Sequence, residues 1–378
     1  MKKVLLILII CSISVQAFSQ MRFVNKVINH FFPEDTTRHN SFMLLPLAGY
    51  NQEAGFMIGG AGLYSFYTDI HDLTIRPSQA SLSLMTSTKG QTQLGFKSDL
   101  WSKKNLWHQI YTLQFYNNPF NYYGIGNATL EADKNRLKQL KLRANAEVER
   151  NFLKNYYAGI GAEYESHQFK DKDPGGIFTH LPTSDQEGGQ FLILKITQVY
   201  DSRNSNTYPT RGFFGKLKYG YAPDFFGKDR FHGNFYSADI RQFIPLRKDL
   251  VLAGKLLFEG LDSKTPVPFY AMRQMGNDEI MRGYYLGRYR DNYYLAMQSE
   301  LRYRFSDRFG IVAFGGVGNV APHANETVKS LKPNYGVGGR FFFDLDKNLA
   351  VRLDYGMGEK RPGEKRISGF YFALSEAF

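Results

Sequence analysis

The sequence predicts an all-β fold, namely a transmembrane antiparallel β-barrel of about 16 strands. From residue 44 onward, apolar and polar residues alternate over long segments, as in strands with one face in lipid and the other in a polar lumen. Aromatic residues make up 16% of the chain, and many Tyr and Phe stand at segment ends, as an interfacial girdle requires. After the N-terminal segment, no continuous apolar run approaches the about 20 residues that a membrane-spanning helix needs.

Residues 1–19 are predicted to be a signal peptide. Two lysines precede an apolar run at residues 4–10, and the small residues Ala17 and Ser19 precede the expected cleavage before Gln20. Cleavage removes Cys11, the single cysteine, so neither disulfides nor thiolate metal ligands are expected in the exported protein.

Residues 20–43 are predicted to be a lead segment in front of the barrel. Residues 21–32 carry apolar side chains at helical spacing, with polar side chains opposite, and Pro33 ends the pattern. This predicts a short amphipathic helix that lies on a membrane surface or in a groove of the barrel. A helix of about twelve residues is marginal in isolation, so a leader that becomes helical only on contact is an equal alternative.

The barrel itself is predicted to span residues 44–378, with its clearest strands at 137–148, 250–259 and 293–305. In the last of these, Gln298, Glu300, Arg302 and Arg304 alternate with apolar residues, and such charges must face the lumen. At roughly 20 residues per strand and connection, about 335 residues give about 16 strands, an even number that closes the barrel. A soluble β-sandwich also alternates, but its strands average about five to six residues, whereas these segments approach about ten.

The last strand is predicted to end at the last residue of the chain. Four of its residues share one apolar face: Phe370, Phe372, Leu374 and Phe378. Glu376 interrupts this face near its end, where water is close. A C-terminal aromatic that closes an alternating strand resembles the signal read by barrel-assembly machinery, which would be a partner during biogenesis. Upstream, the polar segment 170–190, rich in Gly and Pro, is predicted to be a long extracellular loop.

Charge and motif content exclude several classes of function. The formal charge of +12 becomes +10 without Lys2 and Lys3 (12 minus 2), and it is spread without a basic block, so nucleic-acid binding is not expected. Basic loops are instead expected to meet the headgroups of outer-membrane lipids. The eight histidines lack metal-ligand spacing, and no G-x-S-x-G motif or phosphate-binding loop occurs, so we expect no metal, no cofactor and no enzyme.

Two motifs suggest a family. Residues 201–212, DSRNSNTYPTRG, carry D-x-R followed by P-T-x-G at Asp201, Arg203, Pro209 and Gly212. Residues 277–291 carry a tetrapeptide close to [IV]-R-G-[FY] at Met281, Arg282, Gly283 and Tyr284. With residues 44–60 and 119–127, which fit the beginning of such barrels, these stretches resemble the BamA/TamA-type outer-membrane protein family, also called bacterial surface antigens.

The resemblance implies that the second motif lies on a loop folded into the lumen, where its arginine pairs with acidic residues of the barrel wall. Glu300 matches the wall carboxylate in strand context, and its place in the alternation independently turns it inward. A buried arginine fork paired with a carboxylate pins a loop more firmly than an exposed pair does. The alternative is a solvated loop arginine beside an ordinary lumen charge. For Asp201 and Arg203 we expect a role in stabilising a turn.

The chain departs from the family pattern in two places. Where the family has F-x-D-x-G on the neighbouring strand, residues 314–318 place Gly316 at the acidic position. Either the loop is held less tightly, or Asp354 on a later strand replaces the missing partner. The family also places POTRA modules before the barrel, whereas about 25 residues stand here, too few to bury a core. A member lacking POTRA domains is therefore expected.

The resemblance implies a barrel in the outer membrane of a Gram-negative bacterium that aids insertion or translocation of proteins, or of lipids. Such a function would use the seam between the first and last strands, with the loop bracing the wall opposite. The periplasmic partner and the client protein are unidentified. The alternatives are a structural barrel that serves as a scaffold or surface antigen, with homo-oligomerisation left open, and a diffusive pore, against which the inward loop argues.

Overall fold

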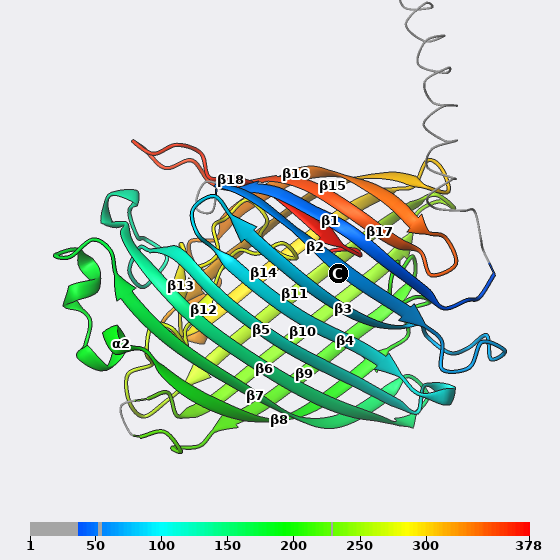
Figure 1. Ribbon diagram of the computed structural model, residues 1–378, viewed down its shortest axis with the longest axis horizontal. Coiled ribbons are helices and arrows are strands. Elements are labelled where there is room, and N and C mark those ends of the chain that lie inside the picture. Colours follow the sequence, from blue (N-terminus) through cyan, green and yellow to red (C-terminus); the bar gives the residue numbers. More distant parts are fainter. Residues whose placement is uncertain (1–36, 52–54, 228–229) are drawn as a thin grey trace, which may run out of the picture.

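The computed structural model describes residues 37–51, 55–227 and 230–378. These residues form one antiparallel sheet of 16 strands whose spatial order follows the chain, which confirms the predicted fold (Figure 1). The signal peptide and the amphipathic stretch 21–32 lie outside the described residues. In the described part of the chain, no helix is long and apolar enough to cross a membrane.

The strands of the barrel are β1 (Ser41–Asn51), β2 (Gly55–Phe66), β3 (Ser78–Ser87), β4 (Thr92–Trp101), β5 (Trp107–Tyr122), β6 (Asn135–Leu153), β7 (Tyr156–Asp171), β8 (Gly189–Asp201), β9 (Gly212–Ala222), β10 (Gly233–Pro245), β11 (Leu250–Asp262), β14 (Tyr293–Tyr303), β15 (Phe309–Ala321), β16 (Lys332–Asp344), β17 (Leu349–Met357) and β18 (Ser368–Leu374). A two-stranded ribbon, β12 (Arg273–Gln274) with β13 (Arg290–Asp291), lies in the loop between β11 and β14. The helix α2 (Thr183–Glu187) and short 3-10 turns lie in other connections. Because β1 begins at Ser41, it includes the last residues that we assigned to the lead segment.

Outward-facing and inward-facing side chains alternate along each long strand, as the sequence pattern predicts. On β14, Met297 is 54% exposed on the outer surface, whereas Glu300 on the inner face is only 1% exposed. On β6, Leu140 and Leu142 face outward, and Glu147 and Glu149 are buried inside. Outward apolar and inward charged side chains are what a barrel in lipid requires.

Side chains and loops fill one end of the lumen. One apolar cluster inside it joins Tyr122 on β5 with Phe178 and Phe269 from the loops, and the rings of Tyr122 and Phe269 lie 5.0 Å apart. Phe178 belongs to the connection predicted at 170–190, which the structure places between β7 and β8. That connection is a loop, as predicted, but it buries Phe178 instead of remaining wholly solvated.

The barrel is not closed by hydrogen bonds. Within the described residues, β1 pairs only with β2, and β18 pairs only with β17, so the expected closure does not form. The two edges overlap instead: β18 passes behind the first strands in the view of Figure 1. Leu45 and Leu63 pack in one apolar cluster with Leu349 and Leu374. We call this contact the seam.

The prediction that the last strand reaches the C-terminus is wrong. Strand β18 ends at Leu374, because Ser375 adopts a left-handed conformation (φ 65°) that breaks the alternation. The chain then turns inward, and Phe378 packs against Phe243 and Ala253 in the lumen. Glu376, expected near water, is buried and pairs with Arg340 at 2.9 Å.

Candidate functional site

The loop between β11 and β14 enters the lumen and presses its backbone against β17. A side chain at Gly356 would place its Cβ 2.6 Å from the carbonyl carbon of Arg282, and a Cβ on Gly283 would lie 2.7 Å from backbone atoms of Met357. Gly283 also has φ +112°, a left-handed conformation that favours glycine. Glycine at both positions therefore lets the loop approach the wall closely.

This approach places Arg282 between the two carboxylates expected from the sequence. Its Nη1 donates to Asp354 Oδ2 at 2.5 Å, and its Nη2 donates to Glu300. The guanidinium carbon lies 3.6 Å from the centre of the Phe314 ring. All three charged side chains are fully buried, so neither ion pair is weakened by solvent.

Further arginines neutralise the same carboxylates. Asp354 also accepts from Arg340 at 2.6 Å and from Arg352 at 2.8 Å, whereas Glu300 has one further partner among the described residues, Arg302, at 2.8 Å. Arg302 in turn donates to the carbonyl of Phe378 at 2.9 Å. We call the network of Arg282, Glu300, Arg302, Arg340, Arg352, Asp354 and Glu376 the lumen clamp. Asp354 is its most highly connected carboxylate.

Neutral side chains hold the loop backbone, and sequence reasoning missed them. Gln298 Oε1 accepts from the Met281 N–H at 3.1 Å, and Asn334 Nδ2 donates to the Arg282 carbonyl at 3.1 Å. The hydroxyl of Tyr371 on β18 accepts from the Gly283 N–H at 2.8 Å. Lumen-facing parity marks Gln298 as inward, but parity alone does not show which loop atoms it meets.

Tyr284, the last residue of the tetrapeptide, bridges the loop to the strand ends. Its hydroxyl donates to the Pro333 carbonyl at 2.7 Å and accepts from the Glu359 N–H at 2.9 Å. Burial raises the pKa of the Tyr284 hydroxyl, so the group keeps its proton and remains a donor. The tetrapeptide thus meets β14, β16, β17 and β18, which form the wall beside the seam and not the wall opposite it as expected.

Asp354, not the residue at 316, supplies the second carboxylate. Strand β15 brings Gly316 against β14, where an added Cβ would lie 2.4 Å from the Met297 carbonyl oxygen and 2.8 Å from Asn334 Oδ1. This position has no room for any side chain. Of the two alternatives that the sequence left open, the geometry agrees with replacement by Asp354.

The substitution Gly316→Asp, which recreates the family motif, is therefore expected to destabilise the barrel. Overpacking of this kind costs about 1–3 kcal/mol, and the new carboxylate would lie where Gln298 and Asn334 already hydrogen-bond to each other. The urea concentration at which half of the protein is unfolded, followed by heat-modifiable gel migration, should fall. Gly95→Asp is the control, because Gly95 lines a cavity in the lumen, where an added Cβ would meet only the flexible Ser83 hydroxyl, at 3.0 Å. A higher midpoint for Gly316→Asp would show that the acidic site is still available.

The first motif forms a separate, structural site. Asp201, at the end of β8, is 2% exposed and accepts from Arg203 Nε at 2.9 Å and from Arg76. Pro209 is buried in the following turn, and Gly212 opens β9 with φ +108°. The turn reaches across this end of the barrel, where Tyr208 packs on Phe342 with ring centres 5.0 Å apart. These contacts are those of a stabilised turn.

Of the four C-terminal signal residues, β18 holds three on one face. Phe370, Phe372 and Leu374 stand opposite alternate residues of β17, whereas Phe378 lies apart in the lumen. Among the described residues, no group of three or more His, Cys, Asp or Glu is placed to hold a metal ion.

Comparison with known proteins identifies the family. Residues 76–378 match the Omp85 superfamily domain. The chain belongs to the Omp85 superfamily. Omp85 proteins are outer-membrane proteins of Gram-negative bacteria that insert or transport other molecules, and they are not known as enzymes. No POTRA-like domain lies in the described part of this Omp85 chain.

Two solved structures share the Omp85 fold. The crystal structure of BamA from Haemophilus ducreyi lacking POTRA domains 1–3 superposes with a TM-score of 0.56 at 13% identity, covering 89% of this chain and 70% of that one. CdiB from Acinetobacter baumannii gives a TM-score of 0.54 at 12% identity, covering 89% of this chain and 59% of CdiB. No curated protein matches the sequence of this Omp85 chain.

Proposed function

We propose that this Omp85 barrel is integral to the outer membrane of a Gram-negative bacterium and aids insertion or translocation of proteins, or of lipids, through its seam. The observation that carries the proposal is the unpaired edge of β1, which β18 overlaps without backbone hydrogen bonds. An unpaired edge is a template to which an incoming strand can add by β-augmentation.

The chemistry of the seam suits reversible opening. Apolar side chains such as Leu45 and Leu374 hold it together, and they can separate without breaking a ladder of hydrogen bonds. Inside the seam, β18 and the inner faces of β3 and β4 line a cavity of about 720 Å³. That volume accommodates several side chains of an extended segment, so a client strand would have space beside β1.

The lumen clamp would support this function by fixing one side of the seam. Arg282 ties the loop to β14 and β17, and Gly283 ties it to β18. We place both described chain ends on the periplasmic side and the loop entry on the extracellular side. The filled end of the lumen argues against a diffusive pore. Retention of a second buried carboxylate, Asp354, removes one reason for preferring a scaffold that no longer transports.

The test is to lock the seam. Leu45→Cys with Leu374→Cys, residues of one apolar cluster, would be joined by a short thiol cross-linker. The control is Leu252→Cys with Leu301→Cys, which are register partners on the paired strands β11 and β14. Two readouts are measured: complementation of a deletion strain, followed as outer-membrane protein content, and assembly of a model β-barrel polypeptide into proteoliposomes that contain the protein.

We expect the cross-link at the seam to abolish both activities and a cleavable linker to restore them on reduction. The control cross-link should leave both unchanged. Full activity of the locked protein would overturn the seam mechanism and favour the structural scaffold.

A further inference from the structure

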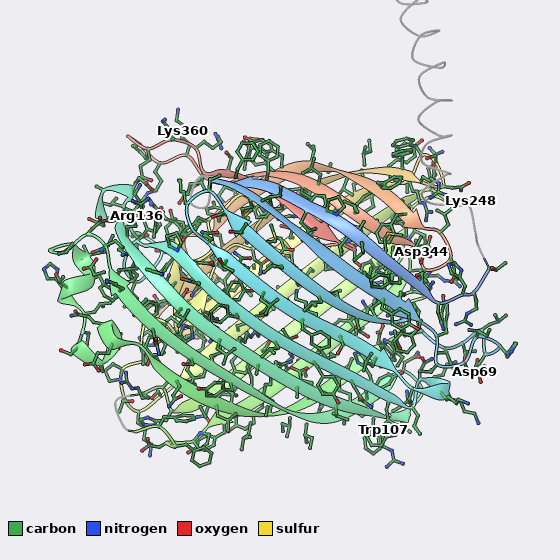
Figure 2. All side chains as sticks on the ribbon, in the orientation of Figure 1. Asp69, Trp107, Arg136, Lys248, Asp344 and Lys360 are labelled. Atoms are coloured by element: carbon green, nitrogen blue, oxygen red, sulfur yellow. The ribbon has the colours of Figure 1, made fainter. Side chains whose placement is uncertain are left out.

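Four basic residues gather on the outer surface where β6 and β7 meet the loops: Arg136, Lys138, Lys170 and Lys172. All four are exposed, and we call them the basic rim patch. Figure 2 places Arg136 at the same end of the barrel as Lys360, and far from Asp69, Trp107 and Lys248. This end lies opposite the turn that carries Asp201.

The patch faces outward, not into the lumen. On β6, Leu137 and Gln139 point inward, where Leu137 is completely buried. Arg136 and Lys138 therefore belong to the outward series that continues as Leu140 and Leu142, which are 37% and 38% exposed. The positive charges thus lie directly above an apolar surface of the kind that contacts acyl chains.

Positively charged residues of the patch lie directly opposite each other on β6 and at the end of β7. Lys138 stands directly opposite Lys170, and the Lys172 N–H donates to the Arg136 carbonyl at 2.9 Å, so the second pair is aligned as well. Like charges directly opposite on neighbouring strands are destabilising. None of these four side chains forms an ion pair with another described residue. The fold therefore keeps an uncompensated positive charge at the boundary of the apolar surface.

A hollow of about 300 Å³ lies beside Arg136, formed by Lys89, Lys134 and Asp173 over Pro119 and Asn121. Lys134 pairs with Glu131 at 2.8 Å, and Asp173 accepts from the Arg136 backbone N–H at 2.8 Å. The Arg136 side chain also lines the hollow and is exposed. A hollow of this size has room for a phosphate group.

We propose that the basic rim patch binds the phosphate groups of a lipid headgroup in the outer leaflet, with the acyl chains of that lipid on Leu140 and Leu142. The combination of paired lysines, an adjoining hollow and apolar side chains immediately below matches an anionic amphiphile, because charge and apolar surface then meet complementary parts of one molecule. The proposal depends on this end of the barrel being extracellular, but it is independent of the seam.

The test uses the full chain in phosphatidylcholine nanodiscs with added lipid A, either phosphorylated or treated with phosphatase. Lipid A retention is measured by native mass spectrometry, and barrel integrity by heat-modifiable migration. The variant is the triple change Arg136→Gln, Lys138→Gln and Lys170→Gln. Its control, Lys103→Gln, Lys104→Gln and Lys154→Gln, removes the same charge from exposed positions at the opposite end.

We expect the rim variant to retain phosphorylated lipid A at least about tenfold more weakly than the parent and the control. Phosphatase treatment should produce the same loss in the parent. Equal retention by parent and rim variant would overturn the proposal, and so would displacement of the lipid by millimolar inorganic phosphate, which would indicate a site for free anions. Because all three proteins keep an intact seam, this result is separate from the outcome of the seam test.

Discussion

Arg282→Ala is expected to lower the free energy of unfolding of the barrel by about 3–5 kcal/mol, the usual cost of removing one partner from a buried ion pair. The change leaves Glu300 and Asp354 buried with one fewer donor each. It also removes the guanidinium that covers the Phe314 ring. The measurement is urea unfolding followed by heat-modifiable migration, with protease sensitivity of residues 277–291 as a report on the loop.

Two comparisons make this prediction specific. Arg247→Ala removes an exposed arginine that pairs with Asp249 at 3.5 Å, and it should change stability by less than about 1 kcal/mol. The double variant Arg282→Ala with Glu300→Ala should cost less than the sum of the single changes by about 1 kcal/mol or more, since neighbours in one network are coupled. Strict additivity would show that Arg282 and Glu300 do not act together.

Asp354→Asn is expected to destabilise the barrel more than Glu300→Gln. Both changes keep the side-chain shape and remove a buried negative charge. Asp354 faces three guanidinium groups, however, whereas Glu300 faces two. Loss of the charge leaves each of these three cations with one carboxylate fewer, and we expect about 3–5 kcal/mol for Asp354→Asn, with a smaller loss for Glu300→Gln.

The same unfolding assay ranks the two variants. Glu147→Gln is a useful reference, because this lumen carboxylate pairs with Lys195 at 3.0 Å and Lys216 at 2.6 Å, outside the clamp. It should affect stability without increasing protease sensitivity of the loop. If Glu300→Gln proves the more damaging change, the clamp is centred on β14, and Asp354 is not its principal carboxylate.

The fold was predictable because the alternation on these strands is long and chemically strong. A shift by one residue on β14 would turn Glu300 and Arg302 to lipid and Met297 into the lumen, so the register is fixed by the side chains themselves. Arg282 and Glu300 could be paired from the motif and from this parity. It was harder to predict whether position 316 could still hold an acidic side chain, because only the packing of β15 on β14 shows that no side chain fits there.

The C-terminus and the seam could not be predicted from the alternation. One left-handed residue, Ser375, moves Glu376 and Phe378 from a continuing strand into the lumen. The arginines that contact these last residues, Arg302 and Arg340, come from the distant strands β14 and β16. Likewise, packing of Leu45 against Leu349 is a contact between distant segments that no local pattern encodes.

The hydrogen bonds of the tetrapeptide 281–284 to a single side of the seam make the barrel mechanically asymmetric. Gln298, Asn334, Asp354 and Tyr371 fasten strands β14, β16, β17 and β18 to one inserted segment, so these strands must move together. Strands β3 and β4 face a cavity instead. Opening of the seam would then move the N-terminal hairpin, β1 and β2, relative to the C-terminal strands, which stay fixed to the loop. Mutations that stiffen the N-terminal hairpin should slow opening of the seam. Mutations in the C-terminal strands should instead change the stability of the closed seam.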